Sequence, residues 1–187
     1  MAIKVYIDQG HNPTNPNAGA EGNGYREQDL VYRIGVLTAD ILRAQGIDVR
    51  LSRPTPTTQL GTSVASSLQA RVNEANSWGA DVFVILHANA SDITSASGQE
   101  AFVYALGTRA ETLAQNILEQ LHISTGLSNR GVSARKSLYV LRKTTMPATL
   151  VELGFITNPY DADLMANSPS LFASGVANGV LAYFGLL

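Results

Sequence analysis

The feature that most constrains the fold is a continuous apolar run, residues 82–86, near the middle of the chain. An unbroken apolar run of this length is typical of a central strand that is covered on both faces. On either side of it, segments with helical spacing alternate with segments that resemble strands. Strands that alternate with helices predict a mostly parallel sheet with helices on both faces. We therefore expect the 187 residues to form one α/β domain built around this run.

The pattern along the chain predicts a mixed, mostly parallel sheet of about six strands. Besides the central run, we expect strands at residues 3–8, 47–51, 99–105, 138–141 and 148–152. Apolar residues recur every three or four positions, as in helices, at residues 30–41, 60–72, 110–121, about 160–166 and about 171–184. Gly46 and Gly79 are expected to end the first two helices. Residues 9–25, rich in Asn, Pro and Gly, are expected to form a loop.

Composition limits the classes of partner. The formal charge of −2 at pH 7 gives no overall electrostatic reason to expect a nucleic-acid partner. The chain has no cysteine, which excludes disulfides and thiolate metal sites. No apolar run is long enough to span a bilayer, so we expect no membrane insertion. The oligomeric state is left open by the sequence.

Three residues that can carry chemistry lie at the ends of predicted strands. His11 follows the first strand, His87 follows the central run, and Glu152 ends the strand at 148–152. In open α/β sheets, ligands bind outside the carboxyl ends of the strands. Either histidine could instead be held by ordinary hydrogen bonds, and His122 near a helix end is best explained by the helix dipole. An acid that ends an apolar strand carries a desolvation cost, which favours a functional role for Glu152.

Two further acids compete for a place beside the histidines. Glu27 lies at a predicted helix start, where the helix dipole alone would favour it, and Glu21 lies in a glycine-rich loop. Together His11, His87 and acids such as Glu27 and Glu152 form a chemically sensible group. Two imidazoles and one carboxylate are the ligands of catalytic zinc sites that leave one position open for water. A second carboxylate nearby can then transfer a proton.

Four segments carry a resemblance to a known family, and they occur in the order that the family has. They are Asp8-Gln9-Gly10-His11, then Glu27 sixteen residues later, then Ile85-Leu86-His87-Ala88-Asn89-Ala90, then Val151-Glu152-Leu153-Gly154-Phe155-Ile156-Thr157-Asn158. Arg71 in the second predicted helix is a further similar position. In these segments the chain resembles the zinc-dependent N-acetylmuramoyl-L-alanine amidases of bacterial autolysins and phage lysins.

The resemblance implies both an activity and a set of residue roles. His11, Glu27 and His87 are expected to bind Zn²⁺, and Glu152 is expected to be the catalytic acid/base. The implied reaction is hydrolysis of the amide bond between the lactyl group of N-acetylmuramic acid and L-alanine of the peptidoglycan stem peptide. A peptidase that cuts within the stem peptide is an alternative. So is a non-catalytic wall-binding or regulatory module on the same fold.

A run of basic residues suggests how substrate is held. It comprises Arg130, Arg135, Lys136, Arg142 and Lys143, with no acid between them. These residues are equally well explained as a solvated face or as groups that bind stem-peptide carboxylates. We expect Asn89, Arg130 and Arg135 to contact the substrate, peptidoglycan.

The same resemblance covers almost the whole chain and sets expectations for its organisation. We expect residues 1–187 to be an amidase catalytic domain without a separate wall-binding domain. Its place of action is then the cell wall, outside the cytoplasm. The first residues contain too short an apolar run for a signal peptide, which predicts export by another route or earlier removal of a leader.

Overall fold

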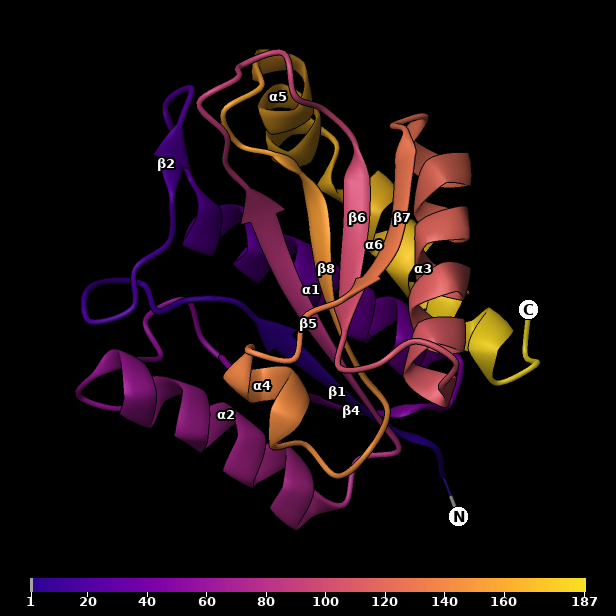
Figure 1. The fold of residues 1–187 in the computed structure, drawn as a ribbon. Helices are drawn as coiled ribbons and strands as arrows, with labels where there is room; N and C mark the ends of the chain where they lie inside the picture. Colours follow the sequence, from indigo (N-terminus) through magenta and orange to yellow (C-terminus); the bar gives the residue numbers. More distant parts are fainter. Residues whose placement is uncertain (1) are drawn as a thin grey trace.

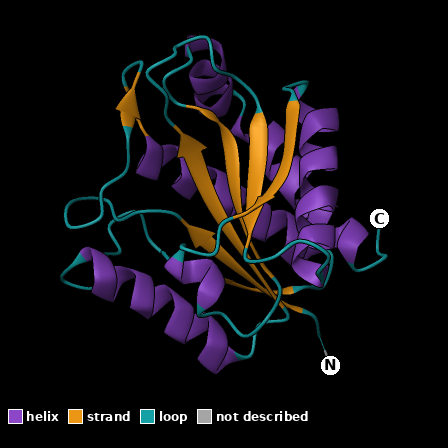
Figure 2. Ribbon diagram, in the orientation of Figure 1, coloured by secondary structure: helices purple, strands orange, loops and turns teal. Residues whose placement is uncertain are grey.

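The protein is described by a computed structural model that covers residues 2–187. Figures 1 and 2 show a central twisted sheet with helices packed on both of its faces. The strands are β1 (Lys4–Gln9), β2 (Glu21–Gly22), β3 (Tyr25–Arg26), β4 (Asp48–Leu51), β5 (Val82–Asn89), β6 (Gln99–Val103), β7 (Asn129–Ala134) and β8 (Ala148–Phe155). The helices are α1 (Glu27–Ala44), α2 (Val64–Trp78), α3 (Arg109–Thr125), α4 (Tyr139–Arg142), α5 (Pro159–Asn167) and α6 (Pro169–Tyr183).

The main sheet has six strands in the order β4-β1-β5-β8-β6-β7. Strands β4, β1, β5 and β8 pair in parallel. Strand β6 is antiparallel to β8, and β7 is parallel to β6. A small separate hairpin joins β2 to β3. The predicted fold class, a mixed and mostly parallel α/β sheet with helices on both faces, is confirmed.

The central run lies where its composition predicted, with apolar packing on both sides. Alternate residues of β5 point to opposite faces, so Val82 and Val84 join the larger core cluster with α1, α3 and α6. Phe83 and Ile85 join a smaller cluster with α2 and α4 on the other face. None of these four side chains is more than 1% exposed. No helix within residues 2–187 combines the length and apolar character needed to cross a membrane.

Two predicted elements differ in kind from the structure. The strand predicted at 138–141 is the short helix α4, which lies between the sheet and α2 and buries Val140 and Leu141. A short apolar run does not distinguish a strand from one buried helical turn. The sixth strand is instead β7, an edge strand with mostly exposed residues, whose sequence lacks the alternation of a half-buried strand.

Other differences concern where elements begin and end. Helix α2 starts at Val64 and not at residue 60, because the Ser63 side chain caps it by accepting a hydrogen bond from the Ser66 amide at 3.1 Å. Strand β8 continues to Phe155, so Glu152 lies within the strand and not at its end. His122 lies inside α3, where a ring nitrogen contacts the Leu127 carbonyl at 2.8 Å.

Candidate active site

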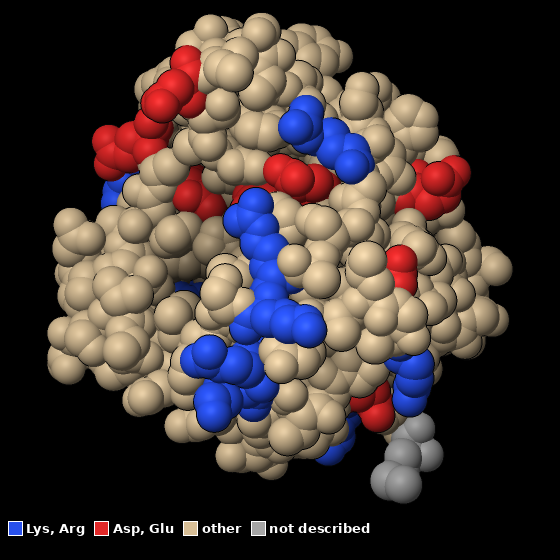
Figure 3. Space-filling view, in the orientation of Figure 1, with Lys and Arg blue, Asp and Glu red and all other residues tan. Residues whose placement is uncertain are grey.

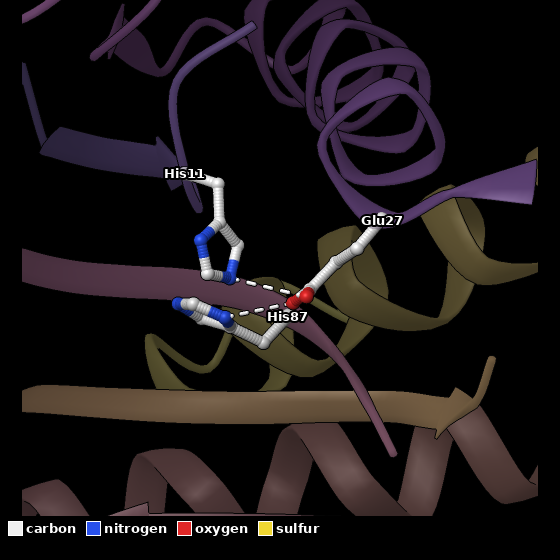
Figure 4. A group of neighbouring side chains, drawn as sticks. All are labelled: His11, Glu27 and His87. Carbon is white, nitrogen blue, oxygen red and sulfur yellow. Dashed lines mark hydrogen bonds and ion pairs between the residues drawn. The ribbon is translucent and has the colours of Figure 1, made fainter. Parts of the chain in front are cut away.

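Three side chains from separate parts of the chain meet above the sheet. His11 follows β1, Glu27 is the first residue of α1, and His87 lies in β5. Figure 4 shows the three side chains pointing toward one another. Glu27 Oε2 lies 3.1 Å from His11 Nε2, and Glu27 Oε1 lies 2.9 Å from His87 Nδ1. Each residue offers one ligand atom within 4.8 Å of the others, which places a possible metal site between them.

Two glycines provide the space that this group needs. A Cβ atom at Gly10 would lie 2.7 Å from His87 Nε2. At Gly19 a Cβ atom would lie 2.8 Å from Glu27 Oε2 and 2.9 Å from His11 Cδ2. Contacts this short are essentially never seen for a real Cβ atom. The glycines therefore let both ends of the β1–β2 connection pass directly against the group of side chains.

The buried carboxylate of Glu27 is held in its ionised form. Burial alone would raise its pKa, but hydrogen bonds and charge from His11 and His87 lower the pKa well below the usual range. Backbone amides add to this, since Ala20 N–H donates to Oε2 at 2.9 Å and Ala88 N–H donates to Oε1 at 3.0 Å. For His87, burial opposes protonation, while its hydrogen bond and ion pair with Glu27 raise the pKa.

The donor set suits zinc. Two imidazoles and one carboxylate match the ligands of open catalytic zinc sites. In addition, the ring nitrogens His11 Nε2 and His87 Nδ1 lie 3.1 Å and 2.9 Å from the oxygens of the ionised Glu27 carboxylate. Two imidazole nitrogens gathered around a carboxylate are groups that a divalent cation would bind. The residues present therefore fit a zinc ion, and the ligand assignment stays a prediction.

Glu152 stands next to this group on the neighbouring strand. It pairs in register with His87 across the parallel β5–β8 ladder, so both side chains extend from the same face of the sheet. Its Oε2 atom is buried and lacks a hydrogen-bond partner among the described residues. Burial raises the pKa of Glu152 to about 7, with His87 opposing this shift and the acids Glu27 and Glu100 adding to it. A carboxyl group in this state can both accept and release a proton near neutral pH.

All four residues face one open pocket of about 370 Å³. It is lined by His11, Ala20, Glu27, His87, Ala88, Asn89, Ala90, Phe102, Arg135, Leu138, Leu150 and Glu152. In Figure 3, Lys and Arg side chains form a band across the middle of this face, beside a hollow. The pocket lining thus combines two imidazoles and two carboxyl groups with one guanidinium group, that of Arg135.

The three predicted substrate contacts are placed differently from one another. The Arg135 guanidinium lies 3.8 Å from the centre of the Phe102 ring and lines the pocket. Asn89 also lines it and donates a hydrogen bond to Glu100 at 2.6 Å. Arg130 is outside the lining: it donates to the Ser97 carbonyl at 3.2 Å and is exposed. Of the two arginines, Arg135 is the one that can reach a ligand in the pocket.

The competing acid Glu21 is not part of the group. It lies in β2, is exposed, and makes only a long ion pair of 3.7 Å with Arg26. The sequence interpretation also missed pocket residues, among them Phe102 and Leu138. Phe102 shares a strand face with Glu100, so alternation along β6 was a signal that could have placed it.

One carboxylate holds the segment that follows β5 and Asn89. The fully buried Asp161 of α5 accepts hydrogen bonds from the Ser97 hydroxyl at 2.7 Å and the Gly98 amide at 3.0 Å. It also accepts one from the Phe155 amide at 3.0 Å. The connection from β5 to β6 is thereby tied to the end of β8.

Comparison with known proteins places this geometry in a family context. Residues 5–182 match the family model described as N-acetylmuramoyl-L-alanine amidase. The chain is 33% identical over 189 residues to the sporulation-specific N-acetylmuramoyl-L-alanine amidase of Bacillus subtilis, covering 98% of this chain and 69% of that protein. It is 34% identical over 189 residues to the N-acetylmuramoyl-L-alanine amidase CwlM of Bacillus licheniformis, with 98% and 70% covered. A solved structure of an N-acetylmuramoyl-L-alanine amidase from Clostridium difficile 630 matches with a TM-score of 0.86 at 32% identity, covering 98% of this chain and 97% of that one.

Proposed function

This chain belongs to the N-acetylmuramoyl-L-alanine amidase family, and from that premise we propose that it is a zinc-dependent hydrolase of peptidoglycan. The bond cleaved is the amide between the lactyl group of N-acetylmuramic acid and L-alanine of the stem peptide. The observation that carries the proposal is the meeting of His11, Glu27 and His87 within 4.8 Å, with Glu152 on the same pocket. The group supplies three metal ligands and one free carboxyl group.

Each of these residues has a distinct task in the proposed mechanism. His11, Glu27 and His87 hold the zinc ion, which when bound lowers the pKa of water from about 15.7 to about 7 and polarises a carbonyl oxygen. Glu152 takes a proton from the attacking water and returns it to the alanine nitrogen as the carbon–nitrogen bond breaks. The products are a lactyl carboxylate on the glycan and a peptide with a free amino terminus. The partner-free Oε2 of Glu152 supports this task, because no other described group competes for its proton.

Arg135, the basic residue of the pocket lining, orients the peptide. Arg135 presents a planar guanidinium that matches a stem-peptide carboxylate, and its position over the Phe102 ring limits where it can turn. Asn89 also lines the pocket and donates a hydrogen bond to Glu100, the register partner of Glu152 on the adjacent strand. These two residues are the substrate contacts we propose, with Arg130 contributing only from outside the pocket.

The proposal extends to place and organisation. Because the family match spans residues 5–182, we assign nearly the whole chain to the catalytic domain. A hydrolase of peptidoglycan acts where its substrate is, so we place its action at the cell wall, outside the cytoplasm. No nucleic-acid partner is needed for this function, and the formal charge of −2 offers no general attraction to one.

Digestion of purified peptidoglycan, followed by mass analysis of the released fragments, tests the activity. An amidase releases whole stem peptides that begin with a free L-alanine and leaves glycan strands without peptide. A stem-peptide peptidase would instead leave shortened peptides attached to the glycan. A protein that sediments with sacculi but releases no fragment would be a wall-binding module. The matched control is the Glu152→Gln variant, which keeps the pocket but cannot take up the proton.

A further inference from the structure

A buried arginine of α2 lies directly beneath the loop that carries His11. Arg71 is 1% exposed and forms an ion pair with the equally buried Asp8 of β1. Its Nη1 donates to the Gln9 carbonyl at 2.8 Å, and its Nη2 donates to the His11 carbonyl at 2.6 Å. Nη2 also lies 3.3 Å from Asn12 Oδ1. One guanidinium group therefore contacts the two residues on each side of Gly10, where β1 ends and the following loop begins.

This segment needs an external support because its backbone is unusual. His11 has a φ of 66°, in the left-handed region that residues with a Cβ atom seldom occupy. Such conformations persist where the surroundings determine them, and they gather at functional sites. The His11 carbonyl itself accepts a hydrogen bond of 2.6 Å from Arg71 Nη2. Arg71 thus binds the backbone at the residue whose conformation most needs to be held.

Arg71 is not the sole polar link between α2 and β1. The same two elements are also linked by the Tyr6 hydroxyl, which donates to Glu74 Oε2 at 2.7 Å. Tyr6 also stacks on Phe83, with ring centres 5.2 Å apart. What only the guanidinium supplies is a planar set of donors that reaches the Asp8 carboxylate and the loop carbonyls together. A lysine ammonium is a compact point charge and cannot span these acceptors in the same way.

We propose that Arg71 is a positioning residue that holds the His11 backbone in the conformation that binds metal. The expected effect on zinc affinity rests on the proposed metal site. The holding of the His11 backbone rests on the contacts that Arg71 makes. It assigns Arg71 no contact with substrate or metal. Its effect passes through the His11 carbonyl to the ring at the other end of the same residue.

Amide hydrogen exchange of the metal-free protein tests the cause without any zinc. The Gly10 amide donates to the Leu86 carbonyl at 3.0 Å, and the Asn12 amide donates to the Asn17 carbonyl at 2.8 Å. In Arg71→Lys we expect both amides to exchange at least about tenfold faster than in the wild type, because the loop opens more often. In Tyr6→Phe, which removes a different α2–β1 bond, we expect these two rates to change less than about twofold. Equal rates in Arg71→Lys and the wild type would overturn the proposal.

Zinc affinity, measured by competition with a chromophoric chelator, tests the consequence. Residues that orient a metal ligand are typically worth about 10–100-fold in affinity, and we expect a loss of that size in Arg71→Lys and a smaller one in Asp8→Asn. Tyr6→Phe should stay within about twofold of the wild type. Faster exchange in Arg71→Lys, combined with a wild-type protein that binds no zinc, would remove the proposed metal site and leave the positioning of His11 intact. If Arg71→Lys does not fold and Asp8→Asn keeps wild-type exchange and affinity, Arg71 serves stability alone and the proposal is wrong.

Discussion

The two walls of the active-site pocket are built in different ways. The wall that carries His11 and Glu27 is anchored by buried polar groups, including the Arg71–Asp8 ion pair. The wall that carries Arg135 comes from the exposed connection after β7. There the Arg135 guanidinium lies over the Phe102 ring. Buried, hydrogen-bonded groups resist displacement, whereas exposed side chains are replaced at small cost. The difference predicts that substitutions in the two walls have effects of different size.

Removing the metal should give the largest loss of activity. It should act only on the wall that carries His11 and Glu27. We expect a strong chelator to abolish the release of peptide from wall sacculi, because the proposed ligands hold the ion that activates water. Added zinc should restore the rate, measured as new amino termini per minute. A rate that persists in protein shown by elemental analysis to be metal-free would end the zinc assignment.

Loss of one ligand should resemble metal removal and sharpen the contrast between two nearby acids. Glu27→Ala removes the carboxylate that contacts both histidines, so bound zinc and activity should fall together. Glu21→Ala changes an exposed acid outside the group and should leave both at wild-type levels. Zinc content by elemental analysis checks this pair. The opposite pattern would transfer the ligand role to Glu21.

Glu152→Gln should separate the chemistry from the metal. Glutamine keeps the size of the side chain but cannot accept a proton, so kcat should fall about 10²–10⁴-fold, the usual contribution of a positioned acid/base. Zinc should remain near one equivalent, because the three proposed ligands are untouched. Zinc content and peptide release are measured on the same sample. Loss of zinc would make Glu152 a ligand, and an unchanged rate would remove it from the mechanism.

The smallest effects on activity should come from substitutions of Arg135 and Arg130. Arg135→Ala should raise KM about tenfold with zinc unchanged, since a guanidinium that lines the pocket loses its bond to a substrate carboxylate. Arg130→Ala should change kcat/KM by less than about threefold, because Arg130 lies outside the lining. Steady-state kinetics on soluble muropeptides compares the two. Equal effects, or none in either, would favour a solvated face over a substrate-binding one.

The sequence predicted the wall that carries His11 and Glu27 better than the wall that carries Arg135, for physical reasons. The apolar run at 82–86 forms a strand covered on both faces, as its composition predicted, and the same strand carries His87. The strand predicted at 138–141 was wrong because the helical turn α4, Tyr139–Arg142, buries the apolar side chains of Val140 and Leu141. Strand β7 was missed because an exposed edge strand needs no apolar alternation.

Long-range contacts explain what else the sequence left out. Nothing local to Arg71 shows that its guanidinium reaches Asp8, which lies 63 positions earlier in the chain. In the same way, the clearance around Gly19 depends on Glu27 and His11 coming together in the folded protein. Local patterns predict which segments form elements, but such contacts arise only when the elements are packed.

The hydrogen bonds that Asp161 accepts have a consequence for how a polymer reaches the pocket. Because its carboxylate ties Ser97, Gly98 and Phe155 together, the β5–β6 connection, which starts after Asn89, is held to the end of β8 before any ligand arrives. We expect turnover to proceed without a gate that must open and close over each bond. A glycan strand of indefinite length could then dock sideways at any point along it. The pace of wall digestion would be governed by how often stem peptides meet the open pocket.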